Sequence, residues 1–185
     1  MDKGGNMSKT LIITGSVRPN SVNHKIVGLV KADIESREGQ EAQVADLGEL
    51  NLPFYNGATP PSAENYEITD ETVRRWSELV TGADAVVLVS PEYNHGLSAV
   101  QKNAIDWLFT EWADKPVAFV AYGWYAGAHS LDQLREISTV IKWKPVEKTA
   151  GLQFMKDIAL DGSVIDAETV SREITGVIDQ LVAAE

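Results

Sequence analysis

Residues 10–23 read TLIITGSVRPNSVN, and this stretch decides the fold. Residues 10–14 are a short, largely β-branched apolar run, which is typical of a strand buried on both faces of a parallel sheet. Gly15 ends the run, and a polar segment then leads to Ser21, after which apolar residues recur with helical spacing. The stretch therefore predicts a central strand, a turn and the beginning of a helix.

Strand-like apolar runs alternate with apolar stripes of helical spacing along the rest of the chain. The predicted strands after the first are residues 42–47, 85–89, 117–121 and 152–155. The predicted helices include residues 26–34, 73–80, 100–108, 131–141 and 170–181. Because parallel strands are joined through crossover helices, this order predicts an α/β fold, a five-stranded parallel sheet with helices on both faces. We expect one domain over residues 10–185, after a disordered leader at residues 1–9.

The composition excludes several classes of protein. The 185 residues carry 16 Lys and Arg against 27 Asp and Glu, a net charge of −11, and no cysteine. A nucleic-acid partner needs a basic footprint, so we expect none. Without cysteine there is no disulfide, no iron–sulfur cluster, no thiolate zinc site and no thiol nucleophile. No apolar run is long enough for a signal peptide or a membrane span, so we expect a cytoplasmic protein with no membrane partner.

The loop after the first strand, residues 15–24, has the donors of a phosphate site. Ligands of open parallel sheets bind beyond the carboxyl ends of the strands, where this loop lies. The next helix begins near Ser21, so its free amides and the positive end of its dipole point at the loop. Ser16, Ser21 and Asn23 add neutral donors and Arg18 a charged one, which together make a cradle for a phosphate dianion. Ser21 by itself is equally well explained as a helix N-cap.

Other phosphate motifs do not fit this loop. A nucleoside triphosphate loop needs Gly-x-x-x-x-Gly-Lys, which does not follow Gly15. A dinucleotide fingerprint needs glycines where residues 16–18 stand, so a nicotinamide-binding dehydrogenase with Asp46 on the ribose lacks its motif. The donors suit a terminal phosphate monoester better than a pyrophosphate.

The loop after the third strand, residues 90–98, reads SPEYNHGLS. Pro91 has no N–H to donate, and Asn94 and Gly96 tolerate left-handed conformations. We expect the loop to present backbone N–H and C=O groups outward, as a surface that reads the edge of a flat heterocycle.

The loop after the fourth strand, residues 122–128, reads YGWYAGA. Gly123 allows close approach, and Trp124 and Tyr125 can stack on a ring, although a subunit contact explains these two aromatics equally well. Phosphate, ring edge and ring face are thereby assigned to three loops at one edge of the sheet. This division is typical of mononucleotide recognition.

Residues 48–69 interrupt the alternation with a stretch too long for an ordinary connection. Such a segment is either a mobile surface loop or a functional one. Phe54, Tyr55 and Tyr66 favour a loop that packs onto the protein.

Several titratable and aromatic side chains near these loops are explained without a catalytic or metal-binding role. His24, His95 and His129 lack the sequence spacing of a zinc site, so we expect no metal and interpret them as hydrogen-bond donors. Glu92 and Asp106 are interpreted as surface or interface charges. Trp107 and Trp112 are interpreted as core or interface aromatics.

These motifs resemble those of the NAD(P)H-dependent FMN reductase family. The family pattern Gly-Ser-x-Arg-x-x-Ser-x-Asn stands at residues 15–23, Pro-Glu-Tyr-Asn stands at residues 91–94, and the continuation KNAIDWL occupies residues 102–108. The similarity extends over about residues 10–153. It implies a flavodoxin-like fold, a three-layer sandwich with strand order 2-1-3-4-5.

The resemblance also implies a set of FMN contacts, with the first loop on the phosphate and the second along the isoalloxazine edge. The third loop departs from the family, which carries paired small residues where this chain has Trp124, Tyr125 and Ala126. The residues expected to bind FMN are Ser16, Arg18, Ser21, Val22, Asn23, Pro91, Glu92, Tyr93, Asn94, His95, Gly123, Trp124 and Tyr125.

The implied activity is that of an FMN-dependent oxidoreductase. NADPH or NADH would reduce FMN, which would then reduce a small-molecule acceptor such as a free flavin, a quinone or an azo compound. Because the cofactor carries the chemistry, no side chain is expected to be catalytic. The family implies a homodimer or homotetramer. The alternative is a flavodoxin-type electron carrier without nicotinamide oxidation, although flavodoxins lack the arginine that this chain has at Arg18.

Overall fold

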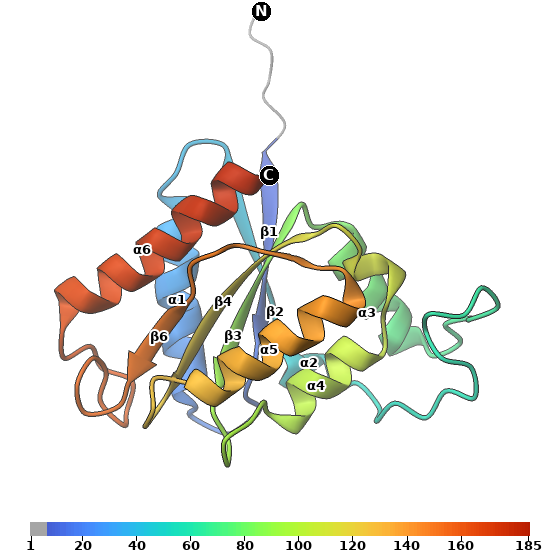
Figure 1. The fold of residues 1–185 in the computed structure, drawn as a ribbon, viewed down its shortest axis with the longest axis horizontal. Coiled ribbons are helices and arrows are strands. Elements are labelled where there is room, and N and C mark those ends of the chain that lie inside the picture. The colour runs from blue at the N-terminus through green and yellow to red at the C-terminus, as the bar shows by residue number, and fades with distance from the viewer. Residues whose placement is uncertain (1–6) are drawn as a thin grey trace, which may run out of the picture.

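The computed structural model of the protein describes residues 7–185, so most of the expected leader, residues 1–6, lies outside the described part. Strands and helices alternate along the chain (Figure 1). Within residues 7–185, no helix is both long and apolar enough to cross a membrane. The elements are β1 (Ser8–Thr14), α1 (Val22–Glu35), β2 (Gln40–Ala45), α2 (Leu47–Leu50), α3 (Glu71–Thr81), β3 (Ala85–Pro91), α4 (Ala99–Asp106), η1 (Thr110–Trp112), β4 (Pro116–Gly123), α5 (Ala128–Ile141), β5 (Lys144–Pro145), β6 (Ala150–Gln153) and α6 (Ala167–Ala184).

The sheet has the strand order β2-β1-β3-β4-β5, with β6 also paired to β4 and every pairing parallel. This confirms the order 2-1-3-4-5. The fifth position of the sheet is shared between two short strands. β5 pairs with Pro116 and Val117 at the start of β4, and β6 pairs with residues 120–123 at its end.

Each of the five predicted strands differs from the observed strand by two residues at one end or at both, and three of these differences have a visible cause. β1 begins at Ser8, whose N–H donates to the Gly39 carbonyl over 2.9 Å, so its first residues belong to the sheet. β2 ends at Ala45 because the Asp46 carboxylate caps the short helix α2. β6 ends at Gln153, whose carbonyl accepts the amides of a turn that follows.

Helices cover both faces of the sheet, α1 and α6 on one and α3, α4 and α5 on the other (Figure 1). Successive residues of β3 point to opposite faces: Val86 and Leu88 join one apolar cluster, and Val87 and Val89 join the other. Because both faces are buried, the central strands are continuous apolar runs rather than alternating ones.

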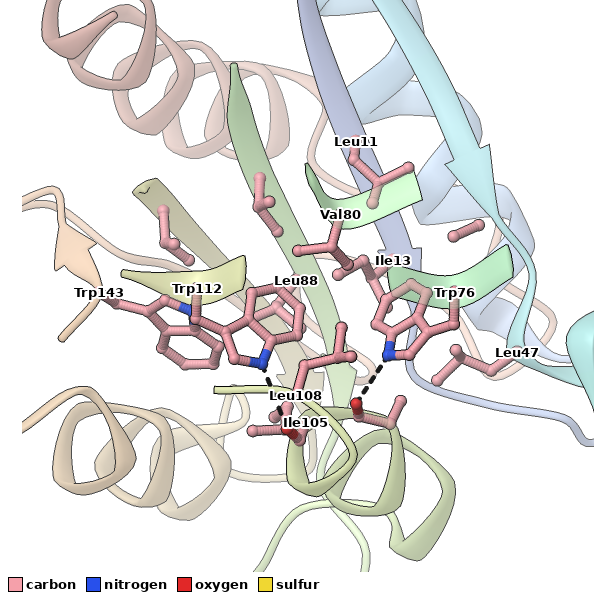
Figure 2. Close-up of a cluster of buried hydrophobic side chains, with 14 of the residues drawn as sticks. Leu11, Ile13, Leu47, Trp76, Val80, Leu88, Ile105, Leu108, Trp112 and Trp143 are labelled. Carbon is pink, nitrogen blue, oxygen red and sulfur yellow. Dashed lines mark hydrogen bonds between the residues drawn. The ribbon is translucent and has the colours of Figure 1, made fainter. Parts of the chain in front are cut away.

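Tryptophans anchor the cluster beneath α3, α4 and α5. Trp76 and Trp112 are fully buried, and their indole N–H groups donate to the carbonyls of Ala104 (2.8 Å) and Ile105 (3.2 Å), as Figure 2 shows. These two bonds fix the end of α4 to α3 and η1. Trp107 is also buried, so of the two explanations for Trp107 and Trp112 the core explanation holds.

The long connection between α2 and α3 leaves the body of the molecule at the right of Figure 1. Its aromatics differ in their packing. The Tyr55 ring meets Trp107 edge-on at 5.0 Å, and the Tyr66 hydroxyl donates to the Trp107 carbonyl over 2.9 Å. Phe54, by contrast, is 76% exposed. The expectation that this segment packs onto the protein is met at Tyr55 and Tyr66 and fails at Phe54.

Candidate functional site

A cavity of about 370 Å³ lies where β1, β3 and β4 end. The first loop contributes residues 18–22 to its wall, and the end of β3 with the second loop contributes residues 91–93. Tyr122 and Trp124 come from the end of β4 and the third loop, and Phe154 and Leu160 follow β6. The three loops singled out in the sequence therefore meet at one site.

Gly15 allows the first loop to leave the sheet at a crowded point. A Cβ at this position would lie 2.5 Å from both Pro91 Cδ and the Val89 carbonyl oxygen. The fully buried Asn23 holds the crossing together: its Oδ1 accepts the Gly15 N–H (3.1 Å), and its Nδ2 donates to the Val89 carbonyl (2.9 Å). Both ends of the Asn23 amide are thus used inside the protein, so this side chain positions the loop.

The first loop turns into α1 at Ser21. Residues 18–21 form a turn closed by the Ser21 N–H on the Arg18 carbonyl (3.2 Å), with Asn20 at a φ of 56°. The Ser21 side chain accepts the Asn23 N–H over 3.2 Å, so Ser21 is the N-cap of α1 and also lines the cavity. The Arg18 guanidinium and the positive end of α1 give this wall a local positive potential, although the chain as a whole is acidic.

Residues 93–96 form a tight turn after β3. The Tyr93 N–H donates to the Gly96 carbonyl (2.9 Å), and the Gly96 N–H donates back to the Tyr93 carbonyl (3.1 Å). Asn94 and His95 have φ values of 49° and 61°, the arrangement of a type I′ turn. Of the two residues that tolerate a left-handed conformation, Asn94 adopts it and Gly96 does not, because the two central positions of this turn are residues 94 and 95.

Ser16 joins the first loop to the second. Its hydroxyl lies 2.7 Å from the Tyr93 hydroxyl and accepts the Arg18 N–H over 3.3 Å. Ser16 is fully buried and does not border the cavity. Like Asn23, it holds the loops in place.

Glu92 joins the second loop to the beginning of α5. Its carboxylate Oε2 accepts the backbone N–H of His129 over 3.0 Å, and its own N–H donates to the Tyr122 carbonyl over 2.9 Å. A carboxylate at a helix N-terminus is favoured by the helix dipole. Glu92 is therefore more than the surface charge that the sequence suggested.

The two aromatics of the third loop point to different neighbours. Trp124 is 58% exposed, borders the cavity and meets the Phe154 ring edge-on at 5.7 Å. Tyr125 is equally open but packs edge-on against His95 and His129, with ring centroids 5.5 and 6.2 Å away. Trp124 alone of the pair is placed to shield a ligand in the cavity.

Five cavity residues are absent from the expected FMN contacts: Pro19 and Asn20 of the first loop, and Tyr122, Phe154 and Leu160. Burial raises the pKa of Tyr122 to about 12, so its hydroxyl stays protonated at neutral pH and remains a hydrogen-bond donor. Phe154 directly follows β6, at the end of the sheet where ligands bind, but the predicted strand, residues 152–155, extended past it and so hid this signal. Leu160 lies in an irregular segment that offers no such signal.

The expected FMN contacts divide into two groups in the structure. Those that line the cavity are Arg18, Ser21, Val22, Pro91, Glu92, Tyr93 and Trp124. Those that lie beside it are Ser16, Asn23, Asn94, His95, Gly123 and Tyr125. Contact of either group with FMN stays a prediction.

Comparisons with known proteins agree with this geometry. A family model described as NADPH-dependent FMN reductase matches residues 8–156. The chain is 39% identical over 140 residues to the NAD(P)H-dependent FMN reductase LOT6 of Saccharomyces cerevisiae, covering 70% of this chain and 72% of the yeast protein. It is 30% identical over 176 residues to an NADPH:quinone oxidoreductase of Arabidopsis thaliana, covering 86% and 83% of the two chains.

Among solved structures, the fold is similar to FerB, a flavoenzyme NAD(P)H:(acceptor) oxidoreductase of Paracoccus denitrificans. The TM-score is 0.75 at 25% identity, over 96% of this chain and 98% of FerB. The family match covers most of the chain, including all three loops that border the cavity. The chain belongs to the NADPH-dependent FMN reductase family.

Proposed function

We propose that this protein oxidises NADPH or NADH and passes the electrons through bound FMN to a small-molecule acceptor, such as a quinone, a free flavin or an azo compound. Membership of the family makes it an oxidoreductase with FMN as cofactor and NAD(P)H as electron donor. The observation that carries the proposal is the cavity at the carboxyl edge of the sheet. A guanidinium and a helix N-terminus border it on the first loop, and aromatic rings border it on the others.

The residues of the cavity fit the two parts of FMN. Arg18, the Ser21 hydroxyl and the amides at the start of α1 would hold the phosphate. Residues 91–93 and the Trp124 ring would hold the flat ring system. FMN, when bound, supplies the hydride-accepting chemistry, and the protein supplies binding, orientation and electrostatics. Tyr122, protonated at neutral pH, adds a neutral donor that does not repel an anionic ligand.

Flavin binding and nicotinamide oxidation are measured on the full-length protein. We expect quenching of FMN fluorescence at micromolar protein, and loss of NADPH absorbance when FMN and a quinone are both present. A protein that neither quenches FMN nor consumes NADPH under these conditions would contradict the proposal. Quenching without any NADPH or NADH consumption would identify an electron carrier instead.

We also propose that the protein is a cytoplasmic homodimer or homotetramer. Phe54, Trp124 and Tyr125 are 76%, 58% and 62% exposed, and aromatic side chains are enriched at protein interfaces, which supports this proposal. Light scattering on a size-exclusion column measures the assembly, and a monomeric mass throughout the micromolar range would exclude it. Cell fractionation tests the compartment.

A further inference from the structure

Three side chains of metal-binding type meet beside the cavity. Glu92 at the end of β3, His95 in the turn after it and His129 in the first turn of α5 each place a donor atom within 4.8 Å of the others. The His95 and His129 rings are stacked, with centroids 4.1 Å apart and planes 21° from parallel. No metal spacing is visible in the sequence because the ligands come from two segments more than thirty residues apart.

Hydrogen bonds fix the spacing of the two segments that carry these side chains. The Ser130 hydroxyl lies 2.9 Å from the Pro91 carbonyl oxygen and 3.0 Å from that of Gly96. The Leu97 N–H donates to Gln133 Oε1 over 2.9 Å. The turn that carries His95 is thereby bound to the helix that carries His129, so the ligand backbone is held in place before any ion arrives.

Glu92 can accept a hydrogen bond with one carboxylate oxygen and bind a metal ion with the other. Its Oε2 accepts the His129 N–H, which orients the carboxylate, and its other oxygen is left for a second partner. An orienting hydrogen bond of this kind is typical of ligating carboxylates. The acidic balance of the chain, −11 overall, also attracts cations.

We propose that Glu92, His95 and His129 form a binding site for a divalent transition-metal ion of the zinc type. Two imidazoles and one carboxylate are a ligand set that zinc accepts in three-ligand sites, where a further position stays open to water or another ligand. Zinc–nitrogen bonds are about 2.0–2.1 Å long. The three donor atoms lie within 4.8 Å of one another, so the side chains have to rotate, and the two imidazole rings have to unstack, to share one ion. Because Glu92 also borders the cavity, the ion would sit at the wall of the flavin site.

Zinc binding is measured by isothermal titration of Zn²⁺ into full-length protein that carries no histidine tag and has been treated with a chelator. We expect one ion per chain. His95→Asn keeps the left-handed turn, because asparagine tolerates it, and His129→Gln keeps a helix former in α5. Each of these variants should weaken Zn²⁺ about 100-fold, since losing a ligand costs at least as much as losing an outer-shell partner.

His24→Gln is the matched control. His24 is exposed, lies 3.6 Å from Asp46 and is outside the cluster, so its loss should leave Zn²⁺ affinity unchanged. Glu92→Gln keeps an acceptor for the His129 N–H and loses only the charge, so weaker binding in that variant separates ligation from helix capping. Thermal unfolding establishes that each variant is folded. Absence of binding at submillimolar Zn²⁺, or equal affinity in the wild type, His95→Asn and His129→Gln, would overturn the site.

Discussion

Arg18 is the cationic side chain that borders the cavity, and its charge has a measurable consequence. Arg18→Ala should weaken FMN binding by about 1.5–3 kcal/mol, the value of a hydrogen bond to a charged group. Riboflavin has no phosphate, so its binding should be weakened much less by the same substitution. Dissociation constants for both flavins come from fluorescence titration.

Arg75→Ala is the control for this experiment, because it removes the same charge from an exposed position on α3 that does not border the cavity. It should change neither affinity. If Arg18→Ala weakened the binding of FMN and of riboflavin equally, the assignment of Arg18 to the phosphate site would be wrong.

Tyr122 provides a prediction in the alkaline range. Burial raises its pKa from 10.0 to about 12, so the folded protein favours the protonated phenol. The resulting contribution to the free energy of unfolding is complete below pH 10.0 and is lost as the pH rises through about 12. Ultraviolet titration should show a late tyrosinate phase that Tyr122→Phe removes. Titration of every tyrosine near its ordinary pKa would contradict this.

At the residue scale, the sequence correctly indicated which loops form the site. It was less successful in predicting the contacts of each side chain. Arg18 and Ser21 border the cavity as their motif predicts. Ser16 and Asn23 belong to the same motif, but Ser16 is hydrogen-bonded to Tyr93, and Asn23 to the backbone of Gly15 and Val89. A motif records that a polar group is required but not which way it points. The partners are distant in sequence, so only the packed structure shows them.

At the scale of elements, Gly127 at the start of α5 is the most constrained glycine of the site. Its φ is 71°, and an added Cβ would lie 2.4 Å from Ala121 Cβ and 2.7 Å from the Tyr122 nitrogen. Strain and overlap together should make Gly127→Ala less stable by about 2–5 kcal/mol. Urea unfolding measures the loss.

Gly28 in α1 gives the opposite case. It is exposed in a helix interior, and nothing lies within 4 Å of an added Cβ. Gly28→Ala should therefore stabilise the protein by about 0.5–1 kcal/mol. A Gly127→Ala variant at least as stable as the wild type would contradict the account of Gly127, and a destabilised Gly28→Ala variant would contradict the account of Gly28.

The type and order of the helices and strands could be predicted because apolar residues recur with a different spacing in strands and in helices. Their ends were not, because caps and turns decide them. Asp46 begins α2 where the apolar run of β2 seemed to continue to Leu47. At β6 the turn after Gln153 ends the ladder before the apolar residues do.

At the scale of the whole molecule, the charge of −11 opposes anionic ligands until they reach the first loop. The range of this repulsion shrinks from about 30 Å at 0.01 M salt to about 8 Å at 0.15 M. Added salt should therefore speed FMN association and leave riboflavin association unchanged. Stopped-flow fluorescence measures both rates, and slower FMN association in salt would show that local attraction outweighs the global field.

The layers and strand order of the molecule followed from the alternation of elements and from the family resemblance. The division of the fifth strand did not, because β5 spans only two residues and carries no apolar pattern. Likewise, the cluster of Glu92, His95 and His129 depends on the meeting of β3 and α5, which no local spacing reveals.

The divided fifth strand also affects the tendency of the protein to aggregate at high concentration. An unpaired sheet edge is a template on which a second molecule can add a strand and begin aggregation. Here that edge consists of two-residue β5, in which Pro145 lacks an N–H, and four-residue β6, separated by a break in the ladder. Neither piece offers enough consecutive donors and acceptors for a stable intermolecular ladder. The interruption therefore protects this edge of the sheet from adding a strand of a second molecule, whereas the opposite edge is the six-residue strand β2.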